Sequence, residues 1–328
     1  MSFYNNKNVL VTGAAGITGH SAVKRLLDEG AHVRATVFSK RKLNISHKNL
    51  EVVQCDLMKH EDCMTVLKDM DVCFNFVAFI KGAKGQTDSK NSLDLVRNNL
   101  FPSINMFDAA VRTKLDRFGF VGSSTMYPDV SHAVNEDEAY DSDPHKLYRG
   151  VGWMKRYSEK VIEYYNSIST TKFGMIRTTA IYGPNDAFND DGHVIPQLIL
   201  KADSKMNPFE VWGDGSQVRD FVYVDDVVDG LMTVVEKNPT GRPYNVATGK
   251  GTTVKELVET ITDIYGYTPE FKYDVTKPTM IPIRLVDVSR IKNELGWEAK
   301  YDLRSGLEKT IEWYKKVNYE KYITVHSI

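Results

Sequence analysis

Hydroxyl-bearing side chains gather in this sequence where an apolar, strand-like run ends. Residues 117–121 are followed by Gly122, and the hydroxyl groups come directly after it, on Ser123, Ser124, Thr125 and Tyr127. Ligands of open α/β sheets bind at the carboxyl ends of the strands, so hydroxyl groups at this edge can hold a sugar hydroxyl or a carbonyl oxygen. The alternative is that one of the two serines caps the strand or the helix that follows it.

A glycine-rich turn near the N-terminus predicts a second kind of chemistry, the binding of a dinucleotide. Residues 8–12 have the pattern of a strand that runs directly into Gly13, Gly16 and Gly19, and a helix with one apolar face follows. Backbone N–H groups of such a turn and the N-terminus of the helix can face an anionic pyrophosphate, and glycine lets the backbone approach it closely. Because strand, turn and helix occur in this order, we favour dinucleotide binding over glycines that merely end a strand.

The residues after the second predicted strand bear on which dinucleotide is bound. A site selective for NAD usually has an Asp or Glu at the end of that strand, where this sequence has Val37. Ser39, Lys40 and Arg41 follow at once, and a hydroxyl with two cations could hold the 2′-phosphate of NADP. The predicted cofactor is NADP or NAD, with a lean to NADP. The alternative is that Lys40 and Arg41 lie on a solvated loop.

The elements that must position these groups alternate between short β-branched runs and longer amphipathic stretches. That alternation predicts the α/β class, with a doubly wound parallel (Rossmann) sheet covered by helices on both faces. Beyond residue 180 this alternation is less regular, and clusters of Gly, Pro, Asn and Asp appear. They predict a smaller C-terminal substrate lobe built from loops. The predicted strands and helices are residues 8–12, 19–29, 32–38, 72–77, 117–121, 254–265 and 303–316.

The length of the chain, 328 residues, favours one large domain with an accessory lobe, because single cores stop growing near about 250–300 residues. We expect residues 1–180 to form a dinucleotide-binding domain, to which residues 220–250 return. The substrate-binding lobe is expected to comprise residues 181–219 and 251–328.

The composition excludes several other classes of protein. The 42 Lys and Arg residues nearly balance the 43 Asp and Glu residues, and no basic stripe is visible, so we expect no nucleic-acid partner. The longest apolar run, residues 72–80, is far below the roughly 20 residues of a membrane helix, and no signal-type segment precedes the first strand. Cys55, Cys63 and Cys73 cannot all pair and fit no common zinc spacing, so we expect a soluble cytoplasmic protein without a metal.

The glycine spacing Gly-x-x-Gly-x-x-Gly resembles that of the extended short-chain dehydrogenases/reductases, the NAD-dependent epimerase/dehydratase family. The likeness covers nearly the whole chain and is greatest to the members that modify GDP-sugars, such as GDP-fucose synthase. It implies that Asp56 and Leu57 contact adenine, although Asp56 could instead be a turn residue at a strand end. It also implies that Val77 and Ala78 lie along the diphosphate and ribose. The cofactor contacts implied in this way are Gly13, Gly16, Ile17, Gly19, Asp56, Leu57, Val77 and Ala78.

Residues 147–159 resemble the catalytic helix of that family, whose signature is a Tyr followed four residues later by a Lys. The lysine is present as Lys155, but the tyrosine position is held by Val151, which can neither donate nor accept a proton. The resemblance implies that Ser123 holds the reacting oxygen, that Thr125 lines the same pocket, and that Lys155 orients the nicotinamide ribose. Tyr148, Ser123, a water molecule and Lys155 itself remain as candidate routes for the proton.

Residues 176–196 resemble the substrate segment of GDP-fucose synthase and its GDP-mannose-processing relatives, which implies a GDP-sugar substrate contacted by Thr179. In those relatives the His before Val-Ile-Pro acts as an acid, and the matching residue here is His193. The alternative is that His193 caps or packs against a helix start. Ala180 departs from the amide side chain that relatives usually have near the nucleotide sugar.

Residues 211–221 resemble the stretch that grips the pyrophosphate in this family, with Arg219 as the binding cation, because an arginine fork binds phosphate oxygens in pairs. Trp212 either stacks beside the base or fills the lobe. Arg284 is in the place of a cation near the second phosphate, unless it forms a surface ion pair with Asp287.

Together these patterns predict an enzyme that transfers a hydride between a nicotinamide and C4 of a GDP-linked hexose or heptose. One alternative is a GDP-fucose synthase-like 3,5-epimerase/4-reductase, which would use His193 but has Thr125 where that enzyme has a Cys. Another is a dinucleotide-binding sensor without catalysis, which Val151 and Ala180 would favour. Relatives pair through the long helices after residues 90 and 150, so a homodimer or homotetramer is expected.

Overall fold

A seven-stranded sheet forms the centre of the molecule in the computed structural model, which describes residues 2–38, 43–79, 89–189, 192–277 and 279–326. Its strands are parallel and lie in the order β11-β6-β5-β4-β1-β2-β3. The order reverses between β1 and β4, and ligands of open α/β sheets bind at such a point. The strands are β1 Asn8–Thr12, β2 His32–Val37, β3 Leu50–Gln54, β4 Val72–Asn75, β5 Arg117–Ser123, β6 Lys172–Thr178 and β11 Pro243–Val246.

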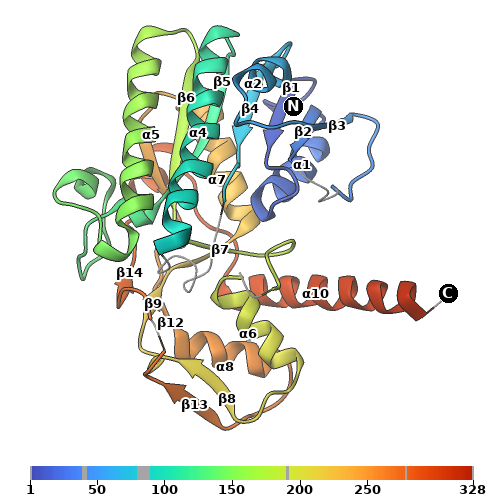
Figure 1. The fold of residues 1–328 in the computed structure, drawn as a ribbon, viewed down its shortest axis with the longest axis vertical. Coiled ribbons are helices and arrows are strands. Elements are labelled where there is room, and N and C mark those ends of the chain that lie inside the picture. The colour runs from blue at the N-terminus through green and yellow to red at the C-terminus, as the bar shows by residue number, and fades with distance from the viewer. Residues whose placement is uncertain (1, 39–42, 80–88, 190–191, 278, 327–328) are drawn as a thin grey trace.

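Helices cover both faces of this sheet, as the predicted doubly wound fold requires (Figure 1). One apolar core lies between the sheet and helices α1 and α7, and a second lies between the opposite face and helices α2, α4 and α5. The predicted fold class is confirmed. The helices of these two layers are α1 Ile17–Asp28, α2 His60–Leu67, α4 Ser89–Arg112, α5 Arg149–Ile168 and α7 Val224–Lys237.

The predicted strand at residues 117–121 is two residues longer than expected. Its parallel ladder with β6 continues through Gly122, opposite Arg177, to Ser123, opposite Thr178. The first hydroxyl group of the cluster therefore lies on the strand itself, at its carboxyl end. Three short 3₁₀ helices follow before α5: Ser124–Met126, Glu136–Tyr140 and Lys146–Tyr148.

A smaller lobe lies below the carboxyl ends of the strands in the view of Figure 1. Its own core is formed by side chains of α6, α8 and α10 together with short strands. The helix predicted at residues 254–265 is α8, and the one predicted at residues 303–316 is α10, which continues to His326. The helices of this region are α6 Val194–Asp203, α8 Val254–Ile264 and α10 Leu303–His326, whereas Ile291 of α9 Ser289–Leu295 packs in the core of α1 and α7. Its strands are β7 Ala180–Tyr182, β8 Phe209–Trp212, β9 Val218–Arg219, β10 Phe221–Tyr223, β12 Thr252–Thr253, β13 Phe271–Asp274 and β14 Ile283–Arg284.

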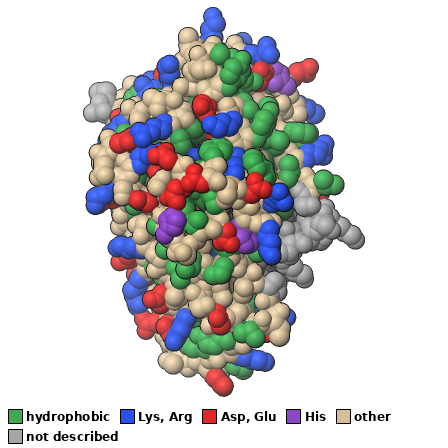
Figure 2. Space-filling model, turned by 90° about the vertical axis from the view of Figure 1, so that its left-hand side faces the viewer, with side chains coloured by type: hydrophobic (Ala, Val, Ile, Leu, Met, Phe, Trp, Pro, Cys, Tyr) green, Lys and Arg blue, Asp and Glu red, His purple; other side chains and the backbone are tan. Residues whose placement is uncertain are grey.

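Charged side chains of both signs are interspersed on the face of the molecule shown in Figure 2, without a continuous basic stripe on that face. Within the described residues, no helix has the length and apolar content to cross a membrane. A search of the same residues finds no group of three or more His, Cys, Asp and Glu side chains able to hold a metal ion.

Candidate active site

The glycine-rich turn between β1 and α1 is shaped by close backbone contacts. Gly13 has a φ of +62°, and a Cβ there would lie 2.7 Å from the carbonyl oxygen of Phe76. A Cβ on Gly19 would lie 2.3 Å from the carbonyl oxygen of Gly13. Helix α1 begins at Ile17, after Gly16, and no side chain caps its first turn. The turn therefore presents uncapped N–H groups at a helix N-terminus, which fits an anionic pyrophosphate.

Asn75 ties the end of β4 to the end of β1, and Asn99 ties the segment after β4 to helix α4. The hydroxyl of Thr12 donates to Oδ1 of Asn75 at 2.6 Å, while Nδ2 of Asn75 is buried and has no partner among the described residues. Asn99 on α4 accepts from the backbone N–H of Phe79 at 2.9 Å and donates to its carbonyl at 2.8 Å. These bonds hold the segment with Val77 and Ala78 beside the glycines. The sequence signal for Asn75 was a polar residue inside an apolar run, whereas Asn99 gave none.

The predicted adenine-side residues follow β3. Leu57 is buried, and Oδ1 of Asp56 accepts from the N–H of Met58 at 3.0 Å, so Asp56 does form a strand-end turn. Its contact with adenine stays a prediction. Val37 ends β2 as expected. The candidates for a 2′-phosphate site, Ser39, Lys40 and Arg41, lie outside the described residues, so the lean to NADP also stays a prediction.

Ser123 and Thr125 form a hydroxyl pair at the end of β5. Oγ of Ser123 accepts from the N–H of Thr125 at 3.2 Å and from its hydroxyl at 3.0 Å. Ser123 thus caps the short helix that follows, as the alternative interpretation expected. Because a serine hydroxyl is also a donor, its own proton is still available to an oxygen in front of the strand.

Lys155 reaches the same edge of the sheet from α5. Its Nζ donates to the carbonyl of Val121 at 2.8 Å and lies 4.8 Å from the centre of the Phe120 ring. Burial lowers the pKa of Lys155 to about 8, and the negative charge of Glu159 acts against this shift. The lysine therefore loses its proton at a pH far below that of an exposed lysine.

Glu159 is one turn after Lys155 and is itself held by a buried arginine. Its carboxylate accepts from Nε and Nη2 of Arg177 at 3.0 and 2.7 Å, and both residues are almost completely buried. A Cβ on Gly122 would lie 3.1 Å from Oε1 of Glu159. This ion pair therefore lies directly behind the strand end that carries Ser123.

Val151 lies in the first turn of α5, at the position where the resembled helix has its tyrosine. The helix approaches the 3₁₀ helix after β5 closely there, since a Cβ on Gly152 would lie 2.8 Å from the carbonyl oxygen of Thr125. Tyr148 precedes the helix, so it does not share a regular helix face with Val151 and Lys155. Burial raises the pKa of Tyr148, and the positive charges of Arg219 and Arg284 act against this shift. Tyr148 thus lies on the arginine side of the site.

The two arginines lie opposite each other in the parallel pair of β9 and β14. Arg219 donates to the carbonyls of Val218 and Pro282 at 2.7 and 3.2 Å. Arg284 is only 7% exposed and donates through Nη1 to the carbonyl of Pro128 at 3.0 Å. Its Nε and Nη2 are buried without a hydrogen-bond partner among the described residues. Burial lowers the pKa of Arg284, and the charge of Arg219 adds to that effect.

This combination of glycine turn, Lys155 and hydroxyl pair agrees with a comparison of the whole sequence with known families, in which residues 9–247 match a single family profile. The chain belongs to the NAD dependent epimerase/dehydratase family. The predicted resemblance and the prediction of a dinucleotide-dependent enzyme are confirmed by this membership. So is the prediction of a nicotinamide dinucleotide as cofactor.

Relatives within the family align over most of this chain. It is 29% identical to GDP-L-colitose synthase of Yersinia pseudotuberculosis, over 93% of this chain and 97% of that protein. It is 27% identical to GDP-L-fucose synthase 1 of Arabidopsis thaliana, over 94% and 93%. A solved structure of MoeE5 in complex with UDP-glucuronic acid and NAD superposes with a TM-score of 0.80, at 26% identity, over 94% of this chain and 99% of that one.

The remaining predicted site residues of this family member lie in the lobe or at its border. His193 precedes α6, and its half-buried side chain makes no capping hydrogen bond. Oγ1 of Thr179 is buried without a partner among the described residues. Trp212 is 39% exposed, with Nζ of Lys277 5.9 Å from its ring centre, so it does not fill the lobe core.

The suggested surface ion pair between Arg284 and Asp287 is wrong. The guanidinium of Arg284 is buried, and Oδ1 of Asp287 accepts from the N–H of Ser289 at 2.7 Å. Strand pairing with β9 turns Arg284 inward, toward Pro128 and away from the surface. The sequence could not show this because the pairing joins segments far apart in the chain.

Proposed function

We propose that this chain is a nucleotide-sugar oxidoreductase that transfers a hydride between a nicotinamide and C4 of a GDP-linked hexose or heptose. The observation that carries the proposal is the buried guanidinium of Arg284, with two donor nitrogens that no described group satisfies. An unsatisfied buried donor costs about 1–3 kcal/mol, and more when it is charged, so a binding partner is expected there.

The chemistry of that partner follows from the charge of its neighbours. Arg219 lies opposite Arg284, and each cation makes the burial of the other more costly. A diphosphate supplies negative charge and several acceptor oxygens, and arginine binds such oxygens in pairs. A nucleoside diphosphate group on the sugar therefore fits this side of the site. The names of the colitose and fucose synthase relatives favour guanine as the base.

The dinucleotide would be held by the turn with Gly13, Gly16 and Gly19, by the segment after β4, and by Lys155. When bound, it supplies the acceptor or donor of the hydride, and the protein supplies placement and electrostatics. The N-terminus of α1, whose first turn no side chain caps, supports this fit. We keep the lean to NADP as part of the proposal.

The proton must move without the tyrosine that Val151 replaces. Ser123, with its hydroxyl oriented by Thr125, is suited to hold the reacting oxygen of the sugar. Lys155 donates to the carbonyl of Val121, two residues before Ser123, and its lowered pKa suits proton exchange near neutral pH. We propose that these two residues, rather than Tyr148, carry the proton route.

The same observations give less support to the two alternative functions, an epimerase/reductase and a sensor. In a 3,5-epimerase/4-reductase, His193 and the residue at position 125 would exchange protons with ring carbons, but the Thr125 hydroxyl is a poor acid or base and already donates to Ser123. A sensor that ignored nucleoside diphosphates would have no use for a buried cation with unpaired donors, such as Arg284, beside a second arginine. Solvent deuterium entering the sugar next to the carbonyl would favour the epimerase.

A single-turnover experiment tests the proposal. The purified protein with its dinucleotide is mixed with a panel of GDP-hexoses and GDP-heptoses, and absorbance is followed in the band of the reduced nicotinamide. We expect a change of about one equivalent with at least one sugar, and binding of GDP in preference to UDP by calorimetry. In Arg284→Met, GDP binding should weaken roughly 10- to 100-fold while dinucleotide binding is retained. No absorbance change with any sugar and no GDP binding would refute the proposal.

We also propose that the chain forms a homodimer or homotetramer through the exposed apolar face of α5. Trp153, Tyr157, Tyr164 and Ile168 are between 46% and 60% exposed and recur at spacings of four, seven and four residues, on one helix face. Light scattering should give a mass above 37.2 kDa for the wild-type protein and a lower mass for Tyr157→Glu.

All three cysteines are free thiols, which is consistent with the cytoplasmic location we propose.

A further inference from the structure

A buried polar network connects the catalytic strand end to the strand that carries Arg284, and Asn245 is at its centre. Oδ1 of Asn245 accepts from the hydroxyl of Tyr127 at 2.6 Å. Its Nδ2 donates to the carbonyls of Val134 and Asp287 at 3.1 and 2.9 Å. Its backbone N–H donates to the buried carboxylate of Glu136 at 2.7 Å. One fully buried side chain on β11 thus contacts three other segments.

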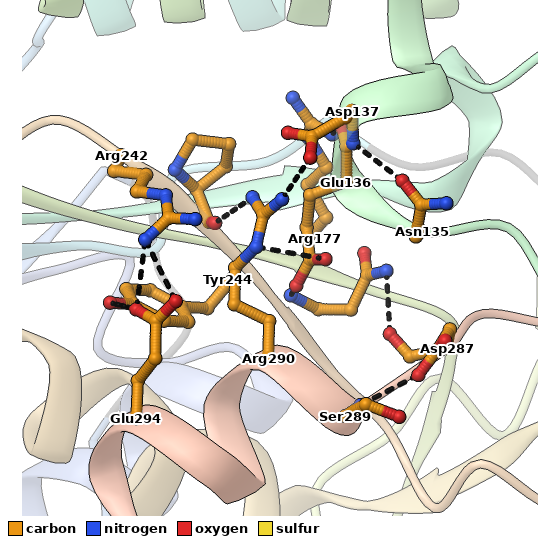
Figure 3. Close-up of polar contacts among 12 residues, drawn as sticks. Asn135, Glu136, Asp137, Arg177, Arg242, Tyr244, Asp287, Ser289, Arg290 and Glu294 are labelled. Carbon is orange, nitrogen blue, oxygen red and sulfur yellow. Dashed lines mark hydrogen bonds and ion pairs between the residues drawn. The ribbon is translucent and has the colours of Figure 1, made fainter.

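Arg290 closes this network from helix α9. Figure 3 shows its guanidinium pointing toward Glu136 and Asp137. Its Nη2 lies 2.6 Å from Oδ2 of Asp137, and its Nε lies 3.4 Å from Oε2 of Glu136. The side chain of Arg290 is only 10% exposed. The start of α9 is therefore attached to the 3₁₀ helix that begins at Glu136.

The same segments fix the backbone just after Arg284. The N–H of Val134 donates to the carbonyl of Leu285 at 3.2 Å, and the N–H of Asp287 donates to the carbonyl of Val134 at 2.8 Å. The guanidinium of Arg284 donates to Pro128, the neighbour of Tyr127. Arg284 is therefore held by the pairing of β14 with β9 and, just after it, by the bonds of Leu285 and Asp287 to Val134. Arg290 then attaches the following helix to Glu136 and Asp137.

We infer that Arg290 and Asn245 are positioning residues, which hold Arg284 where it meets the nucleoside diphosphate of the substrate. The inference rests on the proposed function. Neither residue is placed to touch the substrate, since Arg290 is occupied by Glu136 and Asp137, and Asn245 by Tyr127, Val134 and Asp287. They act through the strand between them and Arg284. The exposed acid Asp137 is dispensable in this scheme, because the buried Glu136 remains.

Arg242 offers a matched control. Arg242 lies in the same cluster in Figure 3. Its Nη1 donates to both carboxylate oxygens of Glu294, a residue of α9, at 2.8 and 2.9 Å. Its side chain is 48% exposed, and its ion pair is with Glu294 rather than with Glu136 or Asp137. Replacing Arg242 removes an arginine that pairs with α9 but leaves the ion pairs of Arg290 with Glu136 and Asp137 in place.

A double-mutant cycle on GDP affinity tests the inference. Calorimetry compares wild type, Arg290→Met, Arg284→Met, the double variant and Arg242→Met, with dinucleotide affinity measured on each. Arg290→Met should weaken GDP binding about 3- to 10-fold, because couplings through packed networks are of this size. The same change in the Arg284→Met background should alter GDP binding less than about 2-fold, since the residue acts through Arg284. Arg242→Met and all dinucleotide affinities should be unchanged.

The other possible results of this experiment separate a failure of the proposed function from a failure of the inference. If the wild-type protein binds no GDP, the proposed function is wrong and the inference falls with it. If wild type binds GDP but Arg290→Met binds it equally well, only the inference is wrong. The inference is equally wrong if Arg290→Met weakens GDP binding in both backgrounds alike or weakens dinucleotide binding as well, because that indicates a general structural role. Should Arg290→Met not fold, Arg290→Lys, which keeps the charge but loses the fork, is expected to give an intermediate GDP affinity.

Discussion

The two ends of the site are built in different ways. The proposed dinucleotide side centres on one short turn, residues 13–19, where backbone packs closely against backbone, as at Gly13 and Phe76. The proposed phosphate-binding side joins β9, β14 and the segment after β5, and its key group, Arg284, depends on partners far away in the chain. Local geometry makes the first side robust and readable from sequence. The second side is sensitive to distant residues, because its cation must be held in place by a network.

The largest effect is expected where the two sides meet. Lys155→Met removes the ammonium group that reaches the end of β5, so we expect kcat to fall about 10²- to 10⁴-fold. Single-turnover absorbance measures the loss. Lys160→Met, on the same helix but exposed and paired with Glu163, is the control and should keep full activity. Equal losses of kcat in both variants would show that activity depends on the integrity of the helix and not on the amine of Lys155.

The next effect isolates the dinucleotide side. Gly13→Ala puts a Cβ against the carbonyl of Phe76 at a positive φ, so we expect dinucleotide affinity to fall roughly 10- to 100-fold, from strain and contact together. GDP affinity should not change. Gly266→Ala is the matched control, because Gly266 has a φ of +67° but nothing within 4 Å of its Cβ position. A Gly13→Ala protein that binds dinucleotide normally would contradict the assignment of this turn.

The smallest effect is a shift of the pH profile. Burial lowers the pKa of Lys155 to about 8, so kcat/KM should fall as the pH rises through about 8, where the folded protein loses this charge. The negative charge of Glu159 favours the protonated amine. Glu159→Gln should therefore move the alkaline limb to lower pH.

Glu163→Gln, an exposed change on the same helix, should leave that limb in place. A profile that is flat between pH 7 and 9 would show that Lys155 is not the titrating group. Because Glu159→Gln leaves Arg177 buried with a neutral partner, its stability should be measured by thermal unfolding alongside the profile.

The fold and the glycine-rich turn could be predicted from the sequence because their signals are local. Strand and helix periods, and glycines three residues apart, are set within a few residues of one another. The roles of Ser123 and Lys155 come from the resemblance and stay predictions, and the absence of a tyrosine at Val151 was visible in the sequence itself.

The rest could not be predicted because it depends on tertiary contacts. The sequence did not show whether Tyr148 lies within α5; it lies before the helix, near the two arginines. The alternative for Arg284, a surface ion pair with Asp287, is wrong because strand pairing buries the arginine. Asn99 and Asn245 gave no signal, because an asparagine's role depends on which carbonyls the fold brings to it.

The position of β11 at one end of the central sheet has a consequence for how this protein can be divided. Residues after the first part of the lobe return to supply β11 and α7, and the apolar side chains of α7 cover the same sheet face as those of α1. A fragment ending near residue 180 would expose that face to water and leave β6 as an unprotected edge. The two halves of the enzyme are therefore interdependent in folding, and neither can be exchanged as a simple N- or C-terminal cassette.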